Sequence, residues 1–446
     1  MNWQRIKEIL NQYSGFREND GNRTGRGFLK NLSYIQVGIF LALMIVAVMP
    51  NFALKYGPSP ALPGALLGLL GVWLLWRHRQ ELWLTPAAGR LTIVFLLLLV
   101  PVLISAPASY NLRYTLSIGG ALVVYYFAGL ALVRVLRGDA ERAWLAKWIS
   151  WVLIFWILDS LIQYLFGVDL FGITKTPDGR VTGPFYNSLR QPMLLALLLP
   201  VGMWFMLRRG VIPALVFFAV AGFVANLGSV RMVLVMLLVA AAGLYMRLPA
   251  SRLNILAALG AFLIMLGAIG LTPTMQERMG RLLDVRVINF ESIDRILSDR
   301  LTIWHTASNM LQARPVTGVG AGAFAKAYDD YSTRPVDMFR GGEVRVFHAH
   351  QGYVSMAAET GLTGLVALFL AIALSLKWYW SAPPTRRAQA WPYALGLVVY
   401  FFPFNTQPPM YHGNWLFPVL LLLFATLLAA LDGPSPATRT AAPKPV

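Results

Sequence analysis

The chain has 446 residues, of which 57% are hydrophobic and only 13% charged. A soluble domain carries roughly 25% charged residues, so this composition excludes a soluble globular protein. The absence of cysteine excludes disulfides, thiolate catalysis, iron–sulfur clusters and cysteine-ligated zinc. The five histidines include no HExxH pattern, and we expect no metal site.

The formal net charge is +18, which by itself could suggest nucleic acid as a partner. The basic residues, however, lie mostly in short connections between apolar stretches. Charge in such places sets the orientation of a membrane protein. We therefore expect membrane lipids around the chain and no nucleic acid.

Residues 1–33 are polar and basic and lack the hydrophobic stretch of a cleavable signal peptide. They predict a cytoplasmic N-terminal segment, with the first helix as the targeting signal. Apolar stretches follow through 34–272, and several reach the roughly 18 residues that cross a bilayer core as a helix. The transmembrane helices predicted there are 34–54, 61–76, 91–108, 115–135, 143–166, 191–207, 212–229, 231–247 and 253–272.

Residues 273–349 form a polar connection that is too long for a simple loop, so a functional role is expected. Within it, Ser298 or Asp299 can cap a helix over 300–313, which Arg314-Pro315 ends. One face of that helix would carry Leu301, Trp304, Ser308 and Leu311. The Gly318–Gly322 run that follows has no preceding strand, which predicts a turn and not a dinucleotide motif.

Residues 350–431 contain three further predicted transmembrane helices, at 351–376, 390–404 and 414–431. The tail 432–446 is rich in Pro, Ala and Thr and predicts a disordered cytoplasmic segment. The fold class expected is therefore an all-α integral membrane protein with about twelve transmembrane helices and one large, partly helical outer loop. No internal repeat is visible.

The distribution of Lys and Arg orients the predicted bundle. With the N-terminus in the cytoplasm, 22 of these residues lie in cytoplasmic segments and six in the short outer loops. This bias follows the positive-inside rule and, with an even number of helices, places both termini in the cytoplasm. The loop 273–349 then lies on the outer side.

Arginines on the outer side need another explanation. A single arginine at a helix end often only extends its guanidinium to lipid phosphates. Several of them at one membrane level, with few carboxylates nearby in sequence, indicate an anionic ligand, because the planar guanidinium fits phosphate oxygens. These outer arginines are Arg180, Arg190, Arg231 and Arg300.

His348 and His350 lie where the outer loop meets the tenth predicted span. On a helix starting at His350, Ala357 and Gly361 would share its face, whereas Glu359 would point about 180° away. His350 and Glu359 are therefore not expected to form a catalytic pair. Glu359 and Asp159 lie within predicted spans, where carboxylates are either functional or held by Arg or backbone donors.

Four segments in order resemble the O-antigen ligase and polymerase superfamily of membrane glycosyltransferases. They are RVTGPFYNSLRQP, GSVRMVLV, SDRLTIWHTASNMLQARPVTGVGAGAF and HAHQGYVSMAAETGLTG, within about residues 175–370. The family signature of a His, a polar residue and a later Gly-x-x-Gly corresponds to His350, Gln351, Gly361 and Gly364. Gln351 departs from the commoner Asn or Ser.

The resemblance implies a metal-independent, GT-C-like glycosyltransferase at the periplasmic face of the bacterial inner membrane, without a cofactor. Its donor would be a glycan on undecaprenyl diphosphate. The acceptor of a ligase would be the lipid A–core oligosaccharide, and the product complete lipopolysaccharide. An O-antigen polymerase or a protein O-oligosaccharyltransferase with the same donor is the alternative, and these motifs do not separate the three.

The expected mechanism divides the site into a base and an anion clamp. His350 would take the proton from the acceptor hydroxyl, since its ordinary pKa of about 6.5 suits a general base. Arg190, Arg231 and Arg300, with Arg180 assisting, would hold the diphosphate and stabilise its developing charge. Secondary candidates are His348, Trp304, Tyr353, Glu359 and Asp159. A transporter using Asp159 and Glu359 as proton relays is a less favoured alternative.

Overall fold

The computed structural model describes residues 85–185, 190–247, 289–333, 348–404, 409–411 and 416–432, with isolated helical residues in 65–76 and 255–280. The described chain is helical throughout and contains a single isolated β-bridge, between Val168 and Thr174. The predicted span 34–54, part of 61–76, most of 253–272, the N-terminal segment and the tail beyond 432 lie outside the described residues, as do parts of the predicted outer loop.

Nine predicted spans coincide with described helices, whose ends differ from the predicted ends by a few residues. These helices are α5 (Pro86–Ser105), α6 (Leu112–Val135), α7 (Asp139–Phe166), α8 (Arg190–Leu207), α9 (Val211–Leu227), α10 (Arg231–Tyr245), α16 (Gly352–Ser381), α17 (Pro384–Phe401) and α18 (Phe417–Asp432). Helices α13 (Phe290–Ile296), α14 (Arg300–Ala313) and α15 (Phe324–Tyr331) lie within the predicted outer loop.

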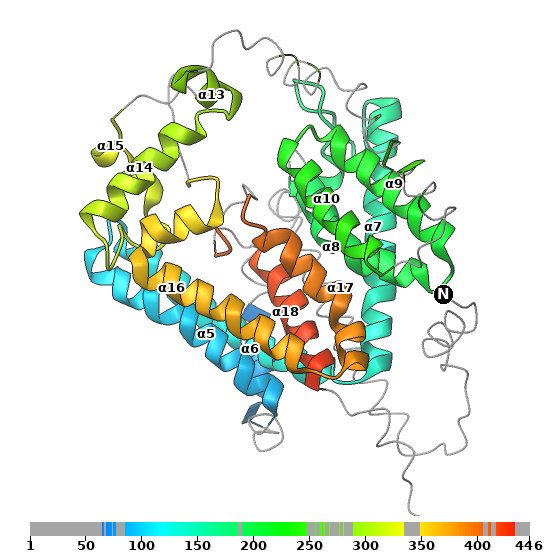
Figure 1. Ribbon diagram of the computed structural model, residues 1–446, viewed down its shortest axis with the longest axis horizontal. Helices are drawn as coiled ribbons and strands as arrows, with labels where there is room; N and C mark the ends of the chain where they lie inside the picture. Colours follow the sequence, from blue (N-terminus) through cyan, green and yellow to red (C-terminus); the bar gives the residue numbers. More distant parts are fainter. Residues whose placement is uncertain are drawn as a thin grey trace, which may run out of the picture. The chain divides into compact units, whose positions relative to one another are not determined.

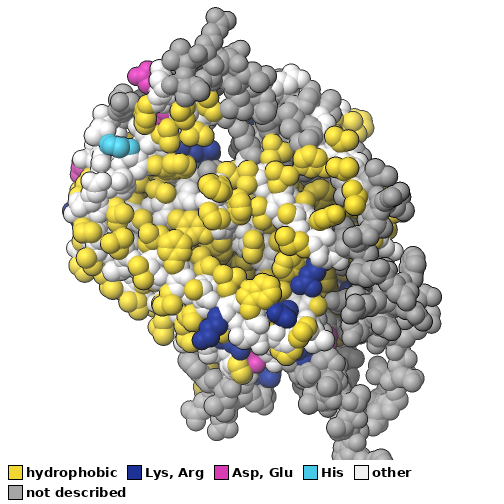
Figure 2. Space-filling model, in the orientation of Figure 1, with side chains coloured by type: hydrophobic (Ala, Val, Ile, Leu, Met, Phe, Trp, Pro, Cys, Tyr) yellow, Lys and Arg dark blue, Asp and Glu magenta, His cyan; other side chains and the backbone are white. Residues whose placement is uncertain are grey.

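Five of the described helices are long and apolar enough to cross a membrane. They are α5 with its 3-10 extension to Ala108, α6, α7, α8 and α16. Their outward faces are apolar, and Figure 2 shows hydrophobic side chains across the face that α16 presents. The large exposed side chains on α16 are Leu362, Val366, Phe369, Leu370, Leu376 and Trp380. Such faces suit contact with lipid.

The described chain divides into two compact units. One contains α7 from Ala140 onward, α8, α9, α10 and Pro392–Phe402. The other contains α5, α6, α13 to α16 and α18, together with the beginning of α17. Each unit carries part of the residues that the sequence singles out.

In the second unit, α5 packs against both α6 and α16, and α6 also packs against α18 (Figure 1). The α5 helix begins at Pro86, since proline is compatible with the first position of a helix. The side chain of the N-cap residue Thr85 accepts a hydrogen bond from the Ala88 backbone N–H at 3.2 Å. The close approach of α6 to its neighbours uses Gly129, where a Cβ would lie 3.0 Å from both Leu91 and Leu421.

The two ends of α5 differ in chemistry. Near its beginning, the Arg90 guanidinium lies 5.8 Å from the Trp378 ring centroid, at the far end of α16. At its other end, the Ser105 hydroxyl accepts a hydrogen bond from the Ala321 N–H, in the turn after α14. Since 20 helical residues extend about 30 Å, the length of α5 equals the thickness of a bilayer core. The loop helices thus lie at the end away from Arg90.

Candidate active site

Helix α14 begins at Arg300 and ends at Ala313, as the sequence predicts. The predicted N-cap position is right, but the expected side-chain capping bond is not made. Asp299 occupies the N-cap with a left-handed φ of 59°, and its side chain makes no capping bond. The buried carboxylate of Asp294 caps the helix instead, because the Leu301 N–H donates to it at 2.7 Å and the Thr302 hydroxyl also bonds to it. The chain reverses at Ser298 and Asp299, and this reversal brings Asp294 of α13 to the first turn of α14.

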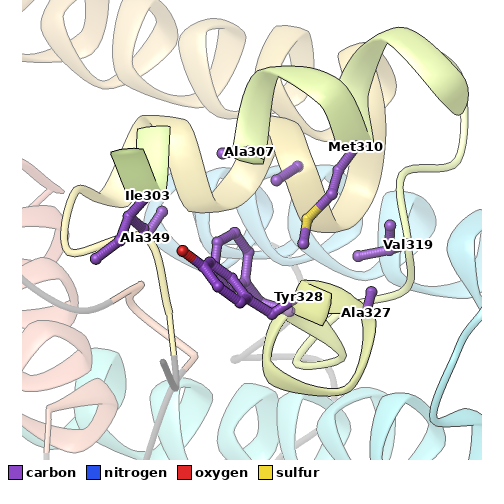
Figure 3. Close-up of a cluster of buried hydrophobic side chains, with 9 residues drawn as sticks. Ile303, Ala307, Met310, Val319, Ala327, Tyr328 and Ala349 are labelled. Carbon is purple, nitrogen blue, oxygen red and sulfur yellow. The ribbon is translucent and has the colours of Figure 1, made fainter. Parts of the chain in front are cut away.

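The face that carries Leu301, Trp304, Ser308 and Leu311 is not the one that packs inward. Leu301 and Trp304 are only partly buried, and Ser308 is exposed. The face that packs inward contains Thr302, Ile303, Thr306, Ala307 and Met310. Figure 3 shows Ile303, Ala307 and Met310 turned toward Val319, Tyr328 and Ala349. This cluster fixes α14 against α15 and the first part of α16.

His350 lies before α16 and not on it, so the predicted helical face is wrong. The helix begins at Gly352, with Gln351 as its N-cap, and His350 has a left-handed φ of 52°. The Gln351 side chain accepts a hydrogen bond from the Val354 N–H at 2.7 Å. The left-handed turn therefore directs His350 away from the helical series that contains Ala357 and Gly361.

Trp304 holds the histidine segment in place. Its indole Nε1–H donates to the Ala349 carbonyl oxygen at 2.9 Å, and Ala349 is fully buried. His348 and His350 flank Ala349 in sequence, and their ring centroids lie 4.2 Å apart with planes tilted by 48°. Trp304 thus anchors the backbone between the two histidines, and the ring of His348 lies next to that of the predicted base.

Arg300 is near enough to His350 to change its ionisation. Burial, followed by the positive charge of Arg300, lowers the pKa of His350 to about 4. The unperturbed value expected from sequence therefore does not apply in the free protein. At neutral pH the imidazole is uncharged and can accept a proton. The structure brings a neutral imidazole and a guanidinium together at the predicted outer side of the second unit.

Glu359 lies in the N-terminal part of α16 and is fully buried. Its Oε2 accepts hydrogen bonds from the Tyr411 hydroxyl at 2.6 Å and from the Gly322 N–H at 2.9 Å. Tyr353, also on α16, stacks on Phe369 with centroids 5.5 Å apart and planes at 12°. Glu359 therefore joins the predicted turn, which the structure confirms, to the helix that follows the histidines.

Three outer arginines belong to the first unit. Arg180 forms an ion pair with Asp178, Nη2 to Oδ2 at 2.5 Å. Although burial acts in the opposite direction, Thr176 and Arg180 hold the pKa of Asp178 below its usual value. Few carboxylates were expected near the outer arginines, and Asp178 is one that pairs with Arg180. Arg190 begins α8 and is partly buried, and Arg231 begins α10, with its side chain outside the described part.

The segments that carry these arginines meet at one end of the first unit. The Val181 N–H donates to the Leu227 carbonyl oxygen at 3.2 Å. A Cβ on Gly228 would lie 2.4 Å from Pro192 and 3.4 Å from the Val181 oxygen, so the three segments are in direct contact. Buried Gln163 supports the segment that follows Arg180, because its Oε1 accepts hydrogen bonds from the N–H groups of Thr182 and Gly183.

Asp159 is fully buried on α7, and its Oδ1 accepts the Leu170 N–H at 3.1 Å. Asp169 lies beside it and accepts the N–H groups of Phe171 and Ile173. Burial, opposed by these backbone bonds, raises the pKa of Asp169. Asp159 thus stabilises the turn after α7. This agrees with the expectation that the carboxylate is held by backbone donors.

Three contributors to the site were not found from sequence: Asp294, Gln163 and Tyr411. Asp294 could have been noticed as an acid one turn before a reversal, and Gln163 as an amide in an otherwise apolar stretch. Tyr411 had no local signal, because its partner Glu359 lies 52 residues earlier. Among the residues that the structure describes, no group of three or more His, Asp or Glu side chains is arranged to hold a metal ion.

The helical architecture and the five membrane-length helices define the class: the chain is an all-α membrane protein. Residues 214–369 match a family model described as O-antigen ligase, which supports the resemblance of this region to the O-antigen ligase and polymerase superfamily. Members of this family are glycosyltransferase-like enzymes. A search of curated proteins found no matching relative.

The matched region extends from α9 into α16. It contains Arg231, Arg300 and His350, together with the glycine turn and Glu359. Arg180 and Arg190 precede it, although the motif order suggested a resemblance beginning near residue 175. The match supports a function of the ligase or polymerase type and does not distinguish between them.

Proposed function

We propose that the protein is an O-antigen ligase of GT-C type that completes lipopolysaccharide at the periplasmic face of the bacterial inner membrane. It transfers a glycan from undecaprenyl diphosphate to the lipid A–core oligosaccharide. The observation that carries this proposal is the neutral His350 beside Arg300 within the family-matched region. Glycosyl transfer from a diphosphate needs both a base for the acceptor and positive charge for the leaving group.

The reaction follows from these two groups. The acceptor hydroxyl oxygen attacks the anomeric carbon, and its proton passes to the His350 imidazole. The bond from that carbon to the diphosphate oxygen breaks, and its electron pair leaves with undecaprenyl diphosphate. Attack opposite the leaving group inverts the anomeric carbon. His350 later releases its proton to water.

Arginine side chains supply the positive charge that other glycosyltransferases take from a metal ion. We assign this role to Arg300, the first residue of α14, and to Arg190 and Arg231 of the first unit, with Arg180 assisting. The Asp178 ion pair neutralises Arg180 and limits it to a supporting role. Guanidiniums aimed at developing charge can provide a major part of the catalysis.

Binding of the donor would also change the pKa of His350. In the free protein, the Arg300 charge and burial hold His350 at a low pKa. A diphosphate bound at Arg300 opposes that charge and raises the pKa of His350 toward neutrality. The imidazole thereby becomes a stronger base when the donor is present.

The test is replacement of His350 by Ala in a strain that depends on this protein for ligation. We expect membrane levels like those of the unaltered protein and loss of the glycan-bearing lipopolysaccharide ladder. Near-normal ligation by the His350→Ala variant would refute the role of the base. Replacement of His305, an exposed histidine on α14, by Ala is the matched control and should leave ligation unchanged.

The polymerase and the protein O-oligosaccharyltransferase share the donor and are separated from the ligase by the acceptor. The transporter alternative needs Asp159 and Glu359 as proton relays. Each of these carboxylates instead accepts backbone hydrogen bonds that hold a local turn. Retained ligation by Asp159→Asn would agree with that structural role.

A further inference from the structure

Helix α16 is interrupted at Gly361, which has φ 67° and ψ −165°. In a continuous helix, the Ala358 and Glu359 carbonyls would accept the N–H groups of residues 362 and 363. Here they accept the N–H groups of Val319 and Gly320, at 3.0 and 2.9 Å. The break therefore exchanges bonds within the helix for bonds to the glycine turn.

Carbonyl groups at the start of the turn also accept hydrogen bonds from α16 just after the break. The Leu362 N–H donates to the Pro315 carbonyl oxygen at 2.7 Å, and the Thr363 hydroxyl donates to the Val316 oxygen at 2.9 Å. A Cβ at Gly361 would lie 2.4 Å from the Val316 oxygen. Only a residue without a side chain permits this approach, so the break and the turn form one interlocked unit.

The Glu359 side chain adds a third element to this unit. Its Oε2 joins Gly322, at the end of the turn, to Tyr411, in the connection before α18. That connection is held at a second point, because the Gln351 Nε2–H donates to the Pro403 carbonyl oxygen at 2.9 Å. The stretch from Gln351 to Glu359 is thus held by Pro403 at one end and by Tyr411 at the other.

This held stretch is the piece of α16 that carries the histidine segment. Ala358 and Ala349 belong to the same buried cluster as Ile303 and Met310 of α14. Because Arg300 begins α14 and His350 precedes α16, the packing of the two helices sets the separation of the two side chains. Glu359 is nine residues from His350 in sequence, and its side chain bonds Gly322 and Tyr411.

We propose that Glu359 and Tyr411 form a buried latch that positions His350 against Arg300, with Glu359 as a positioning residue and Tyr411 as its partner. The inference rests on the proposed function and deepens it. When the latch is intact, the first part of α16 lies firmly on α14 and the glycine turn. When the latch is opened, this part can move away from α14, and the influence of Arg300 on His350 weakens.

Four variants test the latch. Glu359→Ala removes both hydrogen bonds, whereas Glu359→Gln keeps an oxygen that can accept them. Tyr411→Phe removes the hydroxyl alone. Tyr379→Phe is the matched control, because Tyr379 is also buried on α16 but bonds the Arg387 carbonyl oxygen at the opposite end. All four are compared as full-length protein in lipid nanodiscs.

The first readout is glycan transfer from the lipid-linked donor. We expect Glu359→Ala and Tyr411→Phe to lower kcat about 10-fold or more, with little change in the donor KM. Glu359→Gln should recover most of the lost kcat, and Tyr379→Phe should match the unaltered protein. An equally severe loss in Glu359→Gln would overturn the latch, because the accepting oxygen would then not be its essential part.

The second readout follows the ionisation of His350 without catalysis. Diethyl pyrocarbonate modifies neutral imidazole, and peptide mass spectrometry separates His350 from its neighbour His348. In the unaltered protein the modification rate of His350 should stay flat from pH 7.5 to about 5, since its pKa lies near 4. In Tyr411→Phe the rate should begin to fall at higher pH, because Arg300 depresses the pKa less.

Unchanged titration of His350 in both Glu359→Ala and Tyr411→Phe would refute the latch, even if their activity fell. Failure of the proposed function is separate, since it requires transfer by His350→Ala. The chemical titration detects His350 whether or not it acts as the base. A merely structural Glu359 would lower the amount of folded protein without moving the titration.

Discussion

Arg300 and His350 show how one side chain prepares another. Burial and then the guanidinium lower the pKa of His350, which keeps the imidazole neutral and ready to accept a proton. The same guanidinium can hold the leaving diphosphate. A single arginine therefore couples occupation of the donor site to the strength of the base.

This coupling predicts the pH dependence of transfer. The acid limb of kcat/KM reports the free protein and should lie near pH 4, because the rate falls only when His350 becomes protonated. The acid limb of the kcat profile should lie at higher pH than that of kcat/KM, since bound diphosphate raises the pKa of His350. Steady-state kinetics from pH 4 to 8 measure both limbs. Coincident limbs near pH 6.5 would contradict the coupling.

Charge and shape at Arg300 can be separated by two substitutions. Arg300→Lys keeps the positive charge but loses the planar fork, so we expect about 10- to 100-fold weaker transfer with the acid limb unchanged. Arg300→Gln loses the charge and should also raise the acid limb, although burial, the larger cause, keeps it below 6.5. Equal pH profiles for the two variants would argue against a direct charge effect.

At the scale of elements, α14 and α16 depend on the turn between them. Gly361→Ala should destabilise the protein by about 2 kcal/mol or more, because alanine is strained at positive φ and its Cβ would meet the Val316 oxygen. Gly120→Ala on α6 is the control, since a Cβ there meets nothing within 4 Å. Thermal unfolding of the two purified variants measures the difference. Equal melting temperatures would contradict the interlocked arrangement.

Elements with local signals were predictable from the sequence. Helix α14 matched at both ends because Ser298-Asp299 and Arg314-Pro315 mark its start and its end in the sequence. The break in α16 was not predictable, since the bonds that replace its helical ones come from Pro315, Val319 and Gly320, about 40 residues earlier. The predicted face of His350 failed for a different reason, because His350 precedes the N-cap of α16 and has a left-handed φ of 52°. The ion pair of Arg180, in contrast, could have been predicted, because its partner Asp178 is only two residues away in the sequence.

For the whole molecule, the distribution of charge predicts which side of the membrane each end faces. The absence of native cysteine allows a direct test with single substitutions and a membrane-impermeant maleimide. Ser308→Cys, on the exposed face of α14, should react in intact spheroplasts. Thr385→Cys, exposed at the start of α17, should react only after the membrane is permeabilised. The reverse pattern would place the candidate active site in the cytoplasm.

The most direct measurement of the central claim uses purified protein with undecaprenyl-diphosphate-linked glycan and lipid A–core, without ATP or added metal. Mass spectrometry of the products identifies the acceptor. We predict that the unaltered protein attaches the glycan to lipid A–core, in EDTA as well, and that His350→Ala does not. Products that lengthen only the lipid-linked glycan, strong inhibition by EDTA, or undiminished transfer by His350→Ala would contradict the account.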